Sequence, residues 1–249
     1  MNDYRPSNER YSPSSWNPNP QQPGGWGSLQ AQTAAQASIA ERMSFVRKVY
    51  ALFFAGILFA VGGVALAFTV PRLMVTVGSH PWITLFVMIG AVFGAQAVRH
   101  APVVNLLALF GFTALTGVII SPIIALYTQS NPASILQAGV LTVGIFGGLT
   151  AYVFISKRDF SFLRGMVTTG LIVVILAGLL NVLVVGSSAL AFAVSAATLL
   201  LFAGFVLYDT SNIIRRYPTN EYVAGALSLY LDALNIFLSL LRLLNSDRR

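Results

Sequence analysis

The chain has 249 residues, of which 56% are apolar and only 9% are charged, and it contains no cysteine. A soluble domain usually carries about 25% charged residues, so this composition excludes an ordinary water-exposed surface and most soluble enzymes. The missing cysteine also excludes disulfides, thiolate zinc sites and thiol catalysis. The mean hydropathy of +0.74 indicates one protein that crosses a lipid bilayer several times.

The net charge of +7 comes from short basic clusters that border long apolar runs. Loops beside membrane spans have this pattern under the positive-inside rule. We therefore expect contact with a lipid bilayer and no nucleic-acid partner.

The first part of the chain divides into two predicted segments. Residues 1–27 are rich in Pro, Asn, Ser, Gln and Gly, which predicts a disordered tail. They lack the basic-then-apolar order of a secretory signal peptide. Residues 28–48 are Ala- and Gln-rich and end in cations, which predicts a juxtamembrane helix. Residues 49–245 are the predicted transmembrane domain.

This domain contains apolar runs that each approach the roughly 20 residues needed to cross the hydrocarbon core. Because lipid does not tolerate unpaired backbone groups, we predict an all-α membrane protein. Two pairs of glycines, Gly90 with Gly94 and Gly144 with Gly148, have spacing suited to close helix packing. The seven predicted helices cover residues 49–70, 82–98, 103–127, 133–155, 166–185, 189–208 and 222–244.

Charge asymmetry predicts the orientation of these helices. A cytoplasmic N-terminus places Arg99 and the basic stretches at 157–164 and 215–216 inside, and only Arg72 in an outer loop. The seventh helix would then end outside although it carries Arg242. Either the C-terminal tail departs from the rule, or the last segment is short, buried or re-entrant.

Two acids remain after the loops are assigned. Asp159 and Glu221 lie in predicted loops beside cations, where solvation explains them. Asp209 lies at the inner end of the sixth predicted helix and Asp232 near the middle of the seventh. Both are at similar distances from the intervening turn, so at about 1.5 Å per residue we expect them to face each other. Ionisable residues inside membrane spans are functional candidates.

The seventh predicted helix also carries a polar stripe on one face, because its polar and small residues recur at spacings of three and four. The stripe predicts a helix whose polar face lines a cavity. The alternative is that these groups only form hydrogen bonds with neighbouring helices, and the buried carboxylate favours the functional interpretation. The stripe consists of Gly225, Ser228, Asp232, Asn235, Ser239 and Arg242.

Two carboxyl groups in a low-dielectric site cannot readily both ionise, so they are expected to exchange protons in two linked steps. Such a pair is suited to sensing pH, and Arg99 is the candidate cation that would latch one member. The pair offers at most four oxygens, whereas Ca²⁺ prefers about six to eight ligands. Transient passage of Ca²⁺ is therefore favoured over a storage site.

Several runs in the sequence together resemble the Bax inhibitor-1 (transmembrane Bax-inhibitor-motif) family in its bacterial branch. The resemblance covers about residues 40–245. The runs are IFGGLT at 145–150, KRDFSFLRG at 157–165, YDT at 208–210 and ALSLYLDALNIF at 226–237.

The resemblance implies a seven-helix bundle with the last helix at the centre, located in a bacterial inner membrane. It also implies a pH-sensitive calcium leak controlled by Asp209 and Asp232, with Arg99 as the latch. Eukaryotic relatives suppress cell death, and some bacterial relatives modulate a membrane-anchored AAA+ protease. We expect no enzymatic activity and no cofactor beyond transiently bound Ca²⁺.

Two other functions compete with the leak. An intramembrane aspartyl protease also uses two acids on adjacent helices, but Asp232 lacks a neighbouring glycine and lies only 23 residues after Asp209. A non-conducting adaptor could restrain the AAA+ protease through its tail or loops. His80 and His100 are predicted on opposite sides of the membrane, so a zinc site is not expected.

Overall fold

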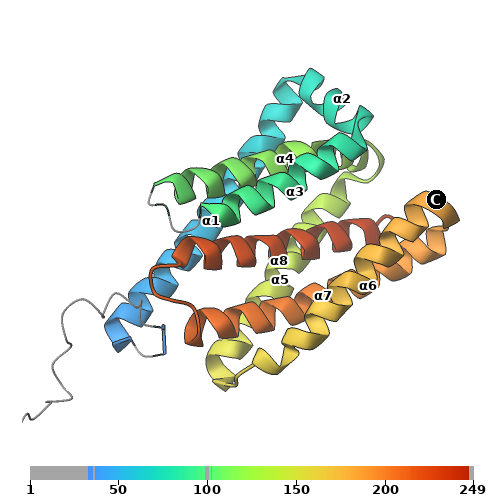
Figure 1. Cartoon of the computed structure of the whole chain (residues 1–249). Coiled ribbons are helices and arrows are strands. Elements are labelled where there is room, and N and C mark those ends of the chain that lie inside the picture. Colours follow the sequence, from blue (N-terminus) through green and yellow to red (C-terminus); the bar gives the residue numbers. More distant parts are fainter. Residues whose placement is uncertain (1–32, 36, 99–100, 102, 247–249) are drawn as a thin grey trace, which may run out of the picture. The chain divides into compact units, whose positions relative to one another are not determined.

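The computed structural model describes residues 33–35, 37–98, 101 and 103–246. The predicted tail at residues 1–27 lies outside them. The described residues form helices joined by short turns, with an antiparallel bridge between Thr33 and Pro218. The helices are α1 (Ile39–Thr69), α2 (Pro71–Ser79), α3 (Pro81–Ala97), α4 (Val104–Ser130), α5 (Pro132–Ser156), the 3-10 turn η1 (Ser161–Leu163), α6 (Arg164–Leu180) with the π-helical turn η2 (Asn181–Val185), α7 (Ser188–Arg215) and α8 (Tyr222–Leu243) (Figure 1).

Six helical segments in the described chain are long and apolar enough to cross a membrane. The second predicted helix, at residues 82–98, corresponds to α3, but residues 71–79, predicted as a loop, form the further helix α2, which meets α3 at a bend of 99°. Each of these two helices begins with a proline, Pro71 and Pro81. A proline fits the first turn of a helix but cannot continue a preceding one, which explains the break at His80. Together the bent pair could form a seventh span.

Helix α1 begins later and extends further than the predicted juxtamembrane helix at residues 28–48. Ser38 caps its first turn: the Glu41 N–H donates to Ser38 Oγ at 3.3 Å, and the Ser38 N–H donates to the Glu41 carboxylate at 3.0 Å. This capping box fixes the start of the helix at Ile39. The helix then runs unbroken to Thr69, so the predicted boundary at residue 48 is corrected to a single continuous helix.

The closest helix packing occurs between α1 and α4. A β-carbon added to Gly63 would lie 2.0 Å from the Ala114 carbonyl oxygen, and one added to Gly117 would lie 2.0 Å from the Ala60 carbonyl oxygen. Only glycine permits this approach of two backbones.

The glycine pairs that the sequence suggested do not pack in this way. A β-carbon added to Gly90, Gly94, Gly144 or Gly148 would meet nothing within 4 Å. The prediction of close packing there is wrong within the described chain, because regular spacing does not determine which face of a helix meets a neighbour.

Helix α8 is the most buried of the candidate spans. In its most apolar stretch 67% of the residues are buried, compared with 11–39% in the other five long spans. It packs against α1, α4, α5 and α7. A polar group on α8 is therefore shielded from lipid by other helices.

Candidate functional site

Helices α7 and α8 form an antiparallel hairpin that carries both candidate acids. Helix α7 continues to Arg215 rather than ending at Tyr208 as predicted. Asp209 therefore lies within the body of α7 and not at its end. We call the end of the molecule formed by residues 157–163 and 216–221 the loop side.

The structure brings Asp209 and Asp232 into electrostatic range of each other. Asp232 is 3% exposed, and its Oδ2 atom has no hydrogen-bond partner among the described residues. Asp209 is partly buried. Leaving a buried polar atom unpaired typically costs about 1–3 kcal/mol, so Asp232 is not explained by a stabilising role.

The rest of the predicted polar stripe on α8 serves several purposes. The Ser228 hydroxyl lies 3.2 Å from the Tyr217 hydroxyl. The Asn235 amide donates to the Leu231 carbonyl of its own helix at 2.8 Å, which fits the simpler structural interpretation for that residue. Ser239 is buried.

Gly225 allows α8 to approach its neighbours closely. A β-carbon at Gly225 would lie 3.3 Å from side-chain atoms of Ile213 and Val49. The backbone of α8 is thus held against α7 and α1 about two turns before Asp232.

Arg242 lies apart from the acid pair. It is exposed and lines a cavity of about 320 Å³ together with polar residues of α4, η2, α7 and the segment that follows α8. Asn245 in this cavity accepts a hydrogen bond from the Asn131 amide at 3.1 Å. The stripe therefore does not form one site: Asp232 interacts with Asp209, whereas Arg242 borders a separate cavity. Polar residues lining the Arg242 cavity include Tyr127, Asn181, Ser188, Ser195, Asn245 and Ser246.

The predicted latch, Arg99, lies outside the described residues. Its role remains a prediction. His100 also lies outside them, so the two histidines cannot be compared. No group of three or more His, Cys, Asp or Glu side chains suited to a metal occurs among the residues that the structure describes.

The structure adds a buried group of hydroxyls that the sequence did not reveal. The Tyr50 side chain of α1 neighbours Thr150 of α5 and Thr210 of α7, but none of the three hydroxyl oxygens has a partner in hydrogen-bond geometry among the described residues. Thr210 directly follows Asp209. These residues come from three helices, so no spacing in the sequence could reveal their convergence.

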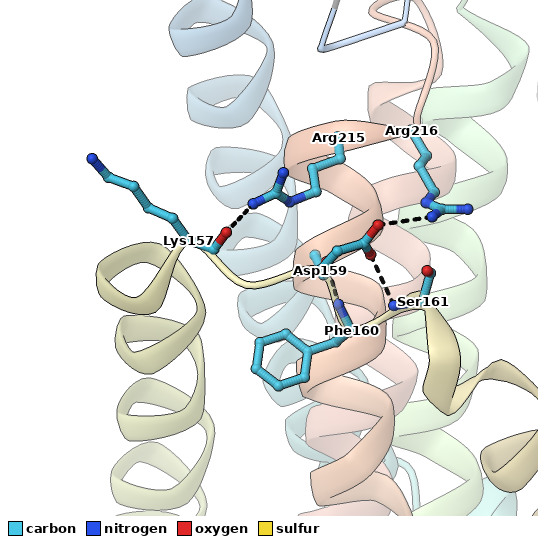
Figure 2. Close-up of polar contacts among 7 residues, drawn as sticks. Lys157, Asp159, Phe160, Ser161, Arg215 and Arg216 are labelled. Carbon is cyan, nitrogen blue, oxygen red and sulfur yellow. Dashed lines mark hydrogen bonds and ion pairs between the residues drawn. The ribbon is translucent and has the colours of Figure 1, made fainter.

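The loop side is held together by polar contacts between the α5–α6 loop and the end of α7 (Figure 2). Arg216 donates to Asp159 Oδ2 at 2.9 Å, and the Ser161 N–H donates to Asp159 Oδ1 at 2.9 Å. The hydrogen bond from Arg216, followed by the one from the Ser161 backbone, lowers the pKa of Asp159 from 3.8 to about 2. Asp159 is thus exposed in a loop beside a cation, as predicted, and the structure adds that it pairs with Arg216 across two loops.

Two further hydrogen bonds reinforce this contact. The buried Phe160 donates its N–H to Ser211 Oγ at 3.1 Å, and Arg215 donates to the Lys157 carbonyl. Arg215 and Arg216 thus both connect the end of α7 to the α5–α6 loop.

A polar cavity of about 350 Å³ opens on the loop side and is lined by Tyr208, the residue before Asp209. Asn212, which follows Asp209 by three residues and so shares its helix face, lines the cavity and has a buried Oδ1 atom without a partner among the described residues. We call it the loop-side cavity. Its lining residues are Ser161, Arg164, Tyr208, Asn212, Arg216, Tyr217, Pro218 and Glu221.

The long apolar helices and the buried acids define a polytopic α-helical membrane protein with ionisable groups between its helices. Residues 42–249 match the family described as "Inhibitor of apoptosis-promoting Bax1". The chain belongs to this family, the Bax inhibitor-1 family, as the sequence motifs predicted.

The relatives include eukaryotic and bacterial proteins. The chain is 35% identical to "Protein lifeguard 4" of Mus musculus over 85% of this chain and 89% of the relative. It is 33% identical to "Bax inhibitor 1" of Schizosaccharomyces pombe over 84% of this chain and 79% of the relative. An "Uncharacterized membrane protein" of Vibrio cholerae is 44% identical over 54% of this chain and 60% of the relative. Of these three names, one describes an inhibitor and one a membrane protein.

Proposed function

We propose that the protein is a pH-sensitive cation leak, with Ca²⁺ as its cargo, in which Asp209 and Asp232 form the proton-sensing site. The observation that carries the proposal is the buried Asp232 carboxyl group, which lacks a hydrogen-bond partner in the described chain and lies near a second acid. A buried carboxyl group without a partner lowers the stability of the fold. A role in binding and releasing protons or cations would explain why the protein has it.

The proposed arrangement has seven spans, with α2 and α3 acting together as one bent span and α8 at the centre. The high burial of α8 and its contacts with four other helices support this arrangement. In a bacterial inner membrane with the N-terminus cytoplasmic, the loop side would face the cytoplasm. The basic residues Lys157, Arg215 and Arg216 on that side fit the positive-inside rule.

Two carboxyl groups close together can exchange protons in linked steps, and each step changes the charge that a passing cation meets. Four carboxylate oxygens are fewer than the about six to eight ligands of a tight Ca²⁺ site. The pair therefore suits transient contact with Ca²⁺ during passage. Arg99 is the proposed latch for one member of the pair.

The proposal is tested by measuring Ca²⁺ flux in proteoliposomes across a range of pH. The unaltered protein should show pH-dependent flux, and Asp209→Asn and Asp232→Asn should each lose that dependence. Glu41→Gln is the matched control, because it removes a carboxylate while glutamine still completes the capping box of α1. The proposal would be refuted if Ca²⁺ flux through the unaltered protein did not depend on pH. It would also be refuted if both variants kept the pH dependence.

A second candidate is a non-conducting regulator that binds a membrane-anchored AAA+ protease. Support comes from the names of the relatives as inhibitors and from the ordered polar loop side, where exposed Arg216 is fixed by Asp159. Co-purification of the full chain with such a protease, lost in a loop-side variant and retained in Asp232→Asn, would favour this candidate.

A further inference from the structure

The segment before α1 is attached to the turn between α7 and α8. Thr33 forms an antiparallel bridge with Pro218, and the Ala34 N–H donates to the Tyr217 carbonyl at 2.9 Å. Ala34 is fully buried. The chain entering α1 therefore holds the backbone of Tyr217 in place.

The side chain of Tyr217 extends from this anchored backbone to the polar face of α8. Its ring lines the loop-side cavity, and its hydroxyl lies 3.2 Å from Ser228 Oγ. Ser228 precedes Asp232 by four residues and so shares its helix face. Burial, and secondarily the nearby charge of Asp209, raises the pKa of Tyr217 to about 12, so its hydroxyl stays neutral.

The loop-side cavity itself is in contact with solvent. Arg216, on its lining, is exposed, whereas Asp232 is almost completely buried. Tyr217 touches both regions, because it lines the cavity and its hydroxyl lies beside Ser228 on the helix face that carries Asp232.

We propose that Tyr217 closes the path from the loop-side cavity to Asp209 and Asp232, and that the Thr33–Ala34 segment holds it closed. This inference rests on the proposed function and names the route by which ions and protons would reach the acid pair. Movement of the segment before α1 would release the Tyr217 backbone and open the route. The N-terminal part of the chain thereby acquires a means of controlling access to a site inside the membrane.

Access can be measured without relying on flux. The chain has no native cysteine, so Asp209→Cys provides a unique thiol beside the proposed closure. Its rate of modification by a small, charged, water-soluble thiol reagent reports access in nanodiscs, where both faces are exposed. Asn220→Cys, at an exposed position of the turn, is the matched reporter that should react at the same fast rate in every background.

The closure predicts a graded series of rates. Tyr217→Ala should raise the Asp209→Cys modification rate by about tenfold or more, because ring and hydroxyl contacts are both lost, whereas Tyr217→Phe should raise it only a few-fold by losing about one hydrogen bond. Ala34→Pro removes the N–H that binds the Tyr217 carbonyl and should also accelerate modification. Ala34→Gly keeps that N–H and should leave the rate nearly unchanged.

An Asp209→Cys rate that stays the same in both Tyr217→Ala and Ala34→Pro would overturn the closure. Thermal unfolding identifies any variant that fails to fold, and Tyr217→Leu then replaces Tyr217→Ala as the variant that decides. Ca²⁺ flux measured in parallel, with native Asp209, separates the two proposals. Faster modification of the Asp209→Cys thiol with no Ca²⁺ flux in any variant would support the closure and refute the leak. An unchanged modification rate with pH-dependent flux would refute the closure and support the leak.

Discussion

Two pairs of ionisable side chains each have one member on or just after α7, Arg216 after its end and Asp209 within it, and they differ in burial and in partners. Asp159 and Arg216 have partly exposed side chains, 44% and 55%, and are joined by an ion pair of 2.9 Å. Asp209 and Asp232 bring two like groups together in the interior, where Asp232 lacks a partner for Oδ2 among the described residues. The first pair connects two loops, and the second destabilises the hairpin that carries it.

The comparison teaches that partners and burial, rather than residue type, separate a structural acid from a functional one. An exposed ion pair contributes at most about 1 kcal/mol and can be replaced. Burying a carboxyl group without a compensating partner costs more free energy of folding than an exposed ion pair contributes. The following predictions test that distinction.

The largest effect is expected from Asp232→Leu. Removing the unpaired buried carboxyl group should increase the free energy of unfolding by about 1–3 kcal/mol, while the pH dependence of Ca²⁺ flux is lost. Thermal or chemical unfolding in one detergent measures the first quantity. Loss of stability by a similar amount would show that the carboxyl group has a structural role, which would remove the contrast between the two pairs.

A smaller effect is expected at the loop side. In a double-mutant cycle of Asp159→Asn and Arg216→Gln, the coupling free energy should be below about 1 kcal/mol, because both side chains are exposed to solvent and screened. The same unfolding assay measures it. A coupling as large as the effect at Asp232 would contradict the description of this pair as a surface contact.

The smallest effect is the pH dependence of the Asp159 contribution. Because the pKa is lowered from 3.8 to about 2 in the folded state, the ion pair stabilises the protein fully above the ordinary value and loses this contribution as pH falls through about 2. After allowance for solvent screening, the contribution is well under about 1 kcal/mol. The stability difference between the unaltered protein and Asp159→Asn should therefore be constant at neutral pH, fall progressively below about pH 5 and vanish only near pH 1, below the folded-state pKa. A difference that stays at its neutral-pH value down to pH 2 would contradict it.

The sequence predicted the membrane spans well because apolar length is a local property. The six long helices coincide with predicted apolar runs, although α7 extends beyond Tyr208 into a polar segment where hydropathy no longer reports the helix. The bend between α2 and α3 was not predicted, although Pro81 carries the signal for a break. Family membership was also predicted correctly, because several motifs had to occur together.

The sequence revealed the acids but not their surroundings. Hydrogen bonding between Tyr217 and Ser228, and the ion pair between Asp159 and Arg216, join segments whose meeting depends on tertiary packing. The regular stripe on α8 likewise suggested one site, whereas Arg242 lies in a separate cavity. Helical spacing predicts that residues share a face, but it does not predict which cavity each part of that face borders.

The central claim is that Asp209 and Asp232 exchange protons as one linked site. Infrared difference spectroscopy of the carboxyl C=O band, recorded during a pH titration of the unaltered protein and of Asp209→Asn, measures this directly. We predict that the protonation midpoint of Asp232 shifts when Asp209 is neutralised, and that Glu41→Gln leaves it unchanged. A midpoint for Asp232 that is the same with and without the Asp209 carboxyl group would contradict the account.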